Sequence, residues 1–118
     1  MYGVPKRDRL IGLKGKELIQ ICIYPNQVIL QFEDNVKISV ESSIVHTKPD
    51  GTECEYEEFW KQGTSLTTLL GSSITEIDVV DQKTLMFLFS NGDSVKLTDD
   101  SDQYESFQFN IGEELIVV

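Results

Sequence analysis

The sequence predicts a mainly β protein in which two antiparallel β-meanders close on each other as a sandwich or partly open barrel. Apolar residues recur at every second position through most of the chain, as they do in strands with one buried face. The same order of alternating segments and turns then occurs twice, at an offset of 56 or 57 residues. Three strands with one apolar face cannot bury that face alone, so the two copies are expected to pack together.

The first meander is expected within residues 17–58. Its alternating segments are Leu18 to Tyr24, Val28 to Phe32 and Val36 to Val40, separated by Pro25-Asn26 and by Glu33-Asp34-Asn35. Asn, Asp and Pro favour turns, which supports three strands joined by tight connections. A further hairpin is expected from Ser43 to Tyr56, turning at Lys48-Pro49-Asp50-Gly51.

The second meander, expected within residues 74–118, repeats this order. Asn91-Gly92 is a strong hairpin signal because both residues readily adopt positive φ. A final hairpin is expected from Tyr104 to Val118. The two meanders are predicted to share one core formed by Ile21, Ile23, Leu30, Phe32, Ile77, Val79, Phe87 and Phe89.

A linker at residues 59–73 holds the one good helix candidate. Thr64 or Ser65 can cap its start, and Gly71 can end it. The apolar residues of its expected buried face are Leu66, Leu69 and Leu70. With a basic N-terminal segment at residues 1–16, the chain of 118 residues is predicted to form one domain.

The charge balance excludes several classes of function. The chain has 20 acidic and 10 basic residues, a formal net charge of −10, whereas nucleic-acid binding requires a basic surface. Its apolar runs are far shorter than the roughly 18 residues of a membrane helix. The basic start leads into no apolar segment of a secretory signal, so we expect a cytoplasmic protein without membrane association.

No enzyme-like arrangement of residues is apparent, so we expect no catalysis, metal or cofactor. His46 is the only histidine, and its position favours a residue on a strand face over a catalytic or metal site. Cys54 could face His46 across the first hairpin. However, Glu53 and Glu55 flank Cys54, and negative neighbours disfavour the thiolate that a nucleophile requires.

Surface recognition is the function that the remaining residues favour. Acidic residues crowd two stretches, and Tyr56 and Trp60 add aromatic anchors of the kind that dominate binding energies. These stretches are either solvated loops or an acidic docking face for a basic partner. The candidate partner-binding residues are Glu53, Glu55, Tyr56, Glu57, Glu58, Trp60, Asp99, Asp100, Asp102 and Glu105.

The residues also resemble a family. Gly15, Leu18 and Ile21, the segments 28–35 and 38–42, and the ending 104–118 are similar to small bacterial β-meander proteins. The likeness extends from about Leu10 to Val118. Proteins of this kind often act as immunity proteins for secreted toxins, including contact-dependent growth inhibition toxins. The resemblance implies a cognate toxin domain as partner, but no catalytic motif to carry over.

We therefore expect a non-enzymatic immunity protein that neutralises a basic, nuclease-type toxin domain through an acidic face. Three other functions stay open: a small-molecule-binding β-barrel, a DNA-mimicking inhibitor, and a hydrolase using His46 or Cys54. An apolar cavity with convergent polar groups would favour the first of these. A toxin gene directly upstream would favour the immunity function.

Overall fold

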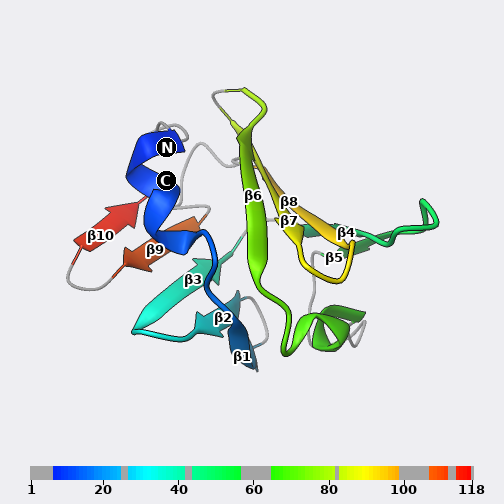
Figure 1. The fold of residues 1–118 in the computed structure, drawn as a ribbon, viewed down its shortest axis with the longest axis horizontal. Helices are drawn as coiled ribbons and strands as arrows, with labels where there is room; N and C mark the ends of the chain where they lie inside the picture. The colour runs from blue at the N-terminus through cyan, green and yellow to red at the C-terminus, as the bar shows by residue number, and fades with distance from the viewer. Residues whose placement is uncertain are drawn as a thin grey trace.

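The protein consists of two five-stranded antiparallel sheets, seen in a computed structural model (Figure 1). The structure describes residues 7–24, 27–41, 44–56, 65–81, 83–98, 107–111 and 114–117. The first sheet has the order β1-β2-β3-β9-β10, formed by Leu18–Tyr24, Gln27–Phe32, Val36–Val40, Phe107–Ile111 and Glu114–Val117. The second has the order β5-β4-β8-β7-β6, formed by Glu53–Tyr56, Ile44–Thr47, Ser94–Thr98, Thr84–Phe89 and Ile74–Val79. The mainly β prediction is confirmed.

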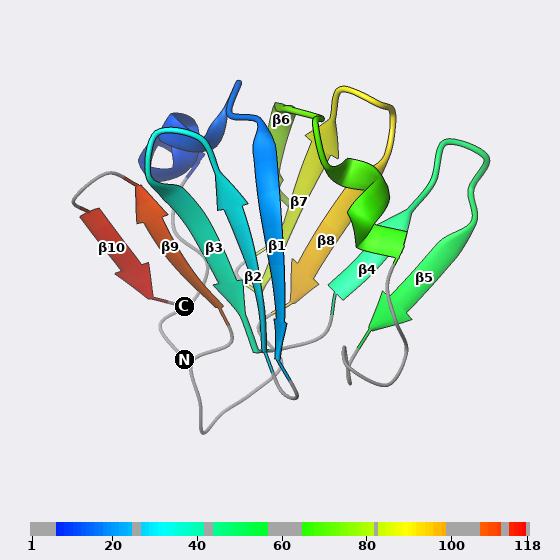
Figure 2. The ribbon, with the colours of Figure 1, turned by 90° about the horizontal axis from the view of Figure 1, so that it is seen from below.

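The two repeats exchange their hairpins. The hairpin β4–β5 follows the first meander in sequence, but β4 pairs with β8 of the second meander. The hairpin β9–β10 follows the second meander, and β9 pairs with β3 of the first. Figure 2 shows β9 and β10 beside β3, and β4 and β5 beside β8. Each sheet is therefore built from both repeats, which ties the two halves into one unit.

Matching backbone hydrogen bonds relate the two halves where they meet. Gly15 N donates to Ile74 O at 2.7 Å, and its counterpart Gly71 N donates to Leu18 O at 2.9 Å. Both glycines have positive φ, 84° and 86°. The repeat also includes two 3-10 helices, η1 at Arg7–Leu13 and η2 at Ser65–Leu69. The pattern is that of an approximate two-fold relation between the repeats.

The core lies between the inner faces of the two sheets. Phe32 of the first sheet stacks on its counterpart Phe89 of the second, with ring centroids 6.5 Å apart. Phe87 and Phe109 make an edge-to-face contact, also between the sheets, at 6.3 Å. The leucines of the two 3-10 helices complete the core: Leu10 and Leu13 from η1, and Leu66 and Leu69 from η2.

Most of the predicted core is buried, but Ile23 is not. Leu30, Phe32, Ile77, Phe87 and Phe89 are buried, and Ile21 and Val79 pack partly buried against them. Ile23 is 41% exposed because it lies near the end of β1, an edge strand with a neighbour on one side only. A bulge between Leu18 and Gln20 also interrupts the alternation, so Leu18 is buried and Ile19 is exposed.

The predicted linker helix is present as η2, but it is a 3-10 helix. Leu66 and Leu69 are buried as expected, whereas Leu70 is exposed. The 3-10 helix has about three residues per turn, so Leu66 and Leu69 align on one side and Leu70 does not. Part of the basic N-terminal segment forms η1, the counterpart of η2. Neither described helix is long and apolar enough to cross a membrane.

Candidate functional site

Two of the predicted partner-binding carboxylates lie on the outer face of the second sheet. Glu53 and Glu55 are exposed on β5, the edge strand, while Cys54 between them packs against the core. The backbone of Tyr56 ends β5 opposite Ile44. The other predicted residues lie outside the described residues: Glu57, Glu58, Trp60, Asp99, Asp100, Asp102 and Glu105.

The strand register places two more carboxylates on the same face. Glu76 and Asp78 are exposed on β6, at the opposite edge of the second sheet. Two rows of outward residues connect the edges: Glu76, Leu88, Ser94, Thr47 and Glu53 in one, and Asp78, Met86, Lys96, Val45 and Glu55 in the other. Four strand spacings separate β6 from β5, a width of about 19 Å.

Sequence reasoning missed Glu76 and Asp78, although a signal was present. Both alternate with the inward Ile77 and Val79, so the predicted strand already placed them on an exposed face. The sequence does not reveal the order of the strands in the sheet, and this order places β6 and β5 in the same sheet. Glu76 has an ion pair with Lys14 at 3.5 Å, and both side chains are exposed.

Between the acidic edges the face has an apolar centre. Val45 and Met86 are half-buried there and Leu88 is exposed. A shallow hollow beside β6 is lined by Glu76, Ile77, Asp78, Met86 and Leu88. Lys96 is the one basic residue in the two rows. Such an apolar centre with a charged rim is the usual anatomy of a protein-binding surface.

The outer face of the first sheet differs in charge. Its corresponding rows are Gln20, Gln31, Lys37, Asn110 and Leu115, and Cys22, Ile29, Ser39, Gln108 and Val117. These rows carry amides and one lysine but no carboxylate. The acidic residues of the described sheet faces thus gather on the second sheet, and we name Glu53, Glu55, Glu76 and Asp78 with their apolar centre the acidic face.

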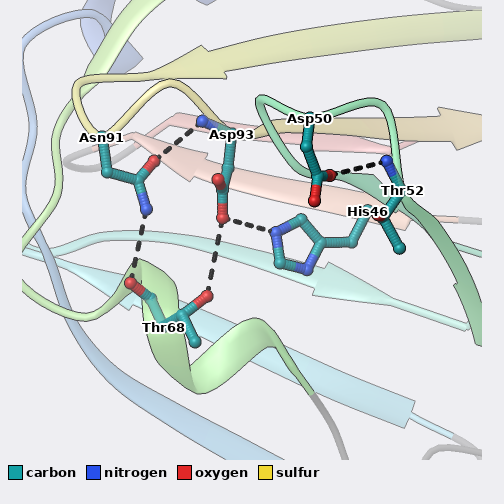
Figure 3. A network of polar contacts seen from close by, with 6 residues as sticks. All are labelled: His46, Asp50, Thr52, Thr68, Asn91 and Asp93. Carbon is teal, nitrogen blue, oxygen red and sulfur yellow. Dashed lines mark hydrogen bonds and ion pairs between the residues drawn. The ribbon is translucent and has the colours of Figure 1, made fainter.

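His46 lies in the core and not at the acidic face. Its Nε2 is 2.7 Å from Oδ2 of Asp93, and the imidazole is fully buried (Figure 3). Thr68 Oγ1 of η2 also donates to this carboxylate, at 3.5 Å. Asn91 accepts a hydrogen bond from Asp93 N at 2.9 Å and donates to Thr68 O at 3.4 Å. The strand-face position predicted for His46 is confirmed, and the network links β4, the β7–β8 turn and η2.

The geometry favours a structural role for this pair. Cys54 lies directly across from His46 in the β4–β5 register, as the sequence suggested. A fully buried imidazole does not reach a substrate in solution, however, and a buried polar side chain needs a hydrogen-bond partner of this kind. Within the described part of the chain, no group of three or more histidine, cysteine, aspartate or glutamate residues could hold a metal ion.

The turn that joins β4 to β5 is held by its own hydrogen bond. Thr52 N donates to Asp50 Oδ1 at 2.9 Å (Figure 3), and this bond lowers the pKa of the Asp50 carboxyl. Gly51 adopts a φ of 91°, a value that glycine reaches without strain. The predicted turn at residues 48–51 is confirmed, and it fixes where β5 and its two glutamates begin.

Comparison with known proteins identifies the family without assigning an activity. The comparisons with curated proteins and with solved structures found no match. A family model covers residues 11–118, from within η1 to the last residue, and so includes both repeats and both exchanged hairpins. The chain belongs to DUF6188, a family of unknown function.

Proposed function

We propose that this protein is a non-enzymatic immunity protein whose acidic face binds a basic toxin domain and blocks access to its substrate. One observation carries the proposal: four carboxylates lie at the two edges of one exposed sheet face, around an apolar centre. The toxin as partner comes from the resemblance to bacterial immunity proteins. Many such toxins act on nucleic acid, and a domain that holds phosphates presents a basic surface.

Electrostatics supports binding through this face. Asp78, Glu53 and Glu55 form no ion pair with any other residue that the structure describes. Their charge is therefore available to attract a basic partner. Charge complementarity of this kind mainly raises the association rate and makes it dependent on salt. The apolar centre can then supply contact area once the partner has docked.

The test is charge reversal with a control of equal charge. The variant Glu53→Lys with Glu55→Lys alters the acidic face at its β5 edge, and Glu76→Lys with Asp78→Lys alters it at β6. The control, Glu33→Lys with Glu41→Lys, changes two exposed residues beside the first sheet, one in the β2–β3 turn and one directly after β3. Binding to the toxin domain encoded beside this gene is titrated at two salt concentrations, and growth rescue is scored on co-expression.

We expect each acidic-face variant to weaken binding at least about tenfold, mainly through slower association. The control should stay within about twofold of wild type. Equal losses in all three variants, or an affinity that salt does not change, would exclude the acidic face as the binding surface. Failure of the wild type to rescue growth would remove the immunity function itself.

Two further variants sharpen the proposal. Asp99→Lys with Asp102→Lys tests the predicted second acidic stretch, which lies outside the described residues. His46→Phe with Asp93→Val removes the buried polar pair and introduces the residue types found at the equivalent positions of the first sheet, Phe109 and Val36. The folded His46→Phe, Asp93→Val protein should rescue growth as wild type does, whereas loss of rescue would reopen a catalytic function for His46.

A further inference from the structure

The four edge strands of the two sheets differ in how they are protected. An unprotected edge presents backbone N–H and C=O groups that can pair with another strand, and natural proteins block this with charge, short strands or coverage. β5 carries Glu53 and Glu55, and β6 carries Glu76 and Asp78. β10 has only four residues, Glu114–Val117. β1, in contrast, has seven residues and no charged side chain.

β1 also exposes apolar side chains. Ile19 is 53% exposed, Ile23 is 41% exposed and Tyr24 is 48% exposed. Leu70, 45% exposed, lies close to the start of this edge, because the next residue, Gly71, bonds to Leu18. Three of the four large apolar side chains that the described strands of the first sheet expose thus lie on its uncharged edge, and the fourth, Leu115, lies on β10. Burial of the three on β1 would be favourable.

No described strand pairs with the outer side of β1 over most of its length. Leu18 uses its N–H and C=O to bond Ser72 and Gly71. From Gln20 to Tyr24, β1 pairs with β2 on one side, and the described residues place no strand on the other. The counterpart edge is better covered, because η1 has seven residues and packs along β6, whereas η2 has five.

We propose that β1 is a homodimer edge, on which the β1 strand of a second copy of this chain pairs antiparallel. The pairing would join two first sheets into one ten-stranded sheet and bury the exposed side chains of Ile19, Ile23 and Tyr24 along the shared edge. An antiparallel strand pair is self-complementary about a two-fold axis, which is the symmetry of most homodimers. This proposal does not depend on the immunity function.

The distribution of charge makes β1 the edge at which two copies of this chain can meet. Each copy has a formal net charge of −10, so two copies repel least where they meet at an edge without carboxylates. β1 is uncharged, and the outer rows of the first sheet contain Lys37 but no carboxylate. Pairing through β5 or β6 would instead bring glutamates and aspartates together. A β1–β1 dimer keeps both acidic faces apart and accessible.

Matched variants at the β1 and β6 edges test this proposal. Ile19→Lys with Tyr24→Lys places charge on β1, while the control, Thr75→Lys with Val80→Lys, makes the same change at the corresponding positions of the other edge. All four side chains are exposed, so both variants should fold. The oligomeric state of the full chain is measured by sedimentation equilibrium from about 1 to 300 μM, because a single strand edge is a small interface and predicts micromolar association.

We expect wild type and the β6 control to dimerise with similar affinity and the β1 variant to weaken dimerisation at least about tenfold. Backbone amides of β1 should gain protection from hydrogen exchange as concentration rises, while those of β5 do not. Wild type that is monomeric over the whole range would overturn the proposal, as would a dimer that only the β6 variant disrupts.

Cross-linking keeps the test valid if the β1 variant does not fold. Cys22 is half-buried at the middle of β1, on the outer face of the sheet. In a Cys54→Ala background, a short reagent with two thiol-reactive ends should link two chains through Cys22 at concentrations where the dimer forms. A dimer that forms by sedimentation but is never linked through Cys22 would contradict pairing along β1.

Discussion

The two sheets of this protein are built alike but fill one equivalent core position in opposite ways. In the first sheet Phe109 of β9 lies between Ile38 and Ile116. In the second sheet His46 of β4 takes the corresponding place, between Val95 and Cys54. Both side chains are fully buried. The same backbone therefore accommodates an aromatic hydrocarbon in one half and an imidazole in the other.

The imidazole is accommodated because the second meander supplies its partner. Asp93 directly precedes β8 and stands at the position that Val36 has at the start of β3 in the first meander. A buried polar group costs free energy unless it is hydrogen-bonded, and Asp93 meets this requirement for His46. The pair also favours the observed exchange of hairpins. His46 of β4 hydrogen-bonds Asp93, whereas the equivalent residue of β9, Phe109, has no group that could do so. The comparison shows that the repeat conserves the shape of the core but not its polarity.

The largest expected effect comes from removing one member of the buried pair. Asp93→Ala leaves His46 in the core without its carboxylate partner and should reduce the free energy of unfolding by about 1–3 kcal/mol, the cost of an unsatisfied buried polar group. Urea unfolding followed by circular dichroism measures the change. A loss below about 1 kcal/mol would mean that the pair is not important for stability.

The equivalent residues of the first sheet indicate which second substitution should restore the stability that Asp93→Ala loses. His46→Phe with Asp93→Val replaces the pair by the kinds of residues found at the equivalent positions, and apolar replacement of a whole buried pair is often neutral or stabilising by about 1–4 kcal/mol. We therefore expect this double variant to be at least as stable as wild type. A double variant less stable than Asp93→Ala alone would show that the two halves are not interchangeable at this position.

A smaller loss of stability, equal in the two repeats, is expected from substitutions at two equivalent glycines. Gly15 and Gly71 occupy corresponding turns with φ of 84° and 86°, and a Cβ at either position would meet no neighbouring atom. Only the backbone conformation then opposes alanine, at about 1–2 kcal/mol per residue. Gly15→Ala and Gly71→Ala should lower the free energy of unfolding by similar amounts. A difference above about 1 kcal/mol between them would break the proposed equivalence of the two turns.

The repeat and its strands were predictable because they are local features. Alternation in segments such as 28–32 and 84–89 determines which residues face the core, and tight turns such as Asn91-Gly92 determine which strands are joined. The exchange of hairpins was not predictable in this way. Alternation is the same whether β4 pairs with β3 or with β8, so the partner depends on contacts between distant segments.

The same limit applies to the candidate site. Glu53 and Glu55 were recognised because they stand in a visibly acidic stretch, whereas Glu76 and Asp78 lie 21 or more residues away in sequence and join them only through the sheet order. The first 3-10 helix was obscured by its basic composition. Leu10 and Leu13 match Leu66 and Leu69 at an offset of 56 residues, a spacing that the charged neighbours made easy to overlook.

The smallest effect is expected from a charge pair at the surface of the first half. Lys16 Nζ is 2.7 Å from Asp34 Oδ2, whereas the corresponding residues of the second half, Ser72 and Asn91, are uncharged. Exposed pairs contribute little because solvent screens them. Lys16→Met should thus change stability at pH 7 far less than Asp93→Ala does in the same urea titration.

The stability that the Lys16–Asp34 pair contributes should depend on pH in a defined direction. The hydrogen bond to Asp34 raises the pKa of Lys16 above its ordinary value of 10.5. A group whose folded pKa is raised contributes stability below its unfolded pKa, and that contribution is lost as pH rises through the folded value. The difference between wild type and Lys16→Met should therefore be constant up to about pH 10 and disappear at higher pH. A difference that widens at alkaline pH would contradict the role of the Asp34 contact.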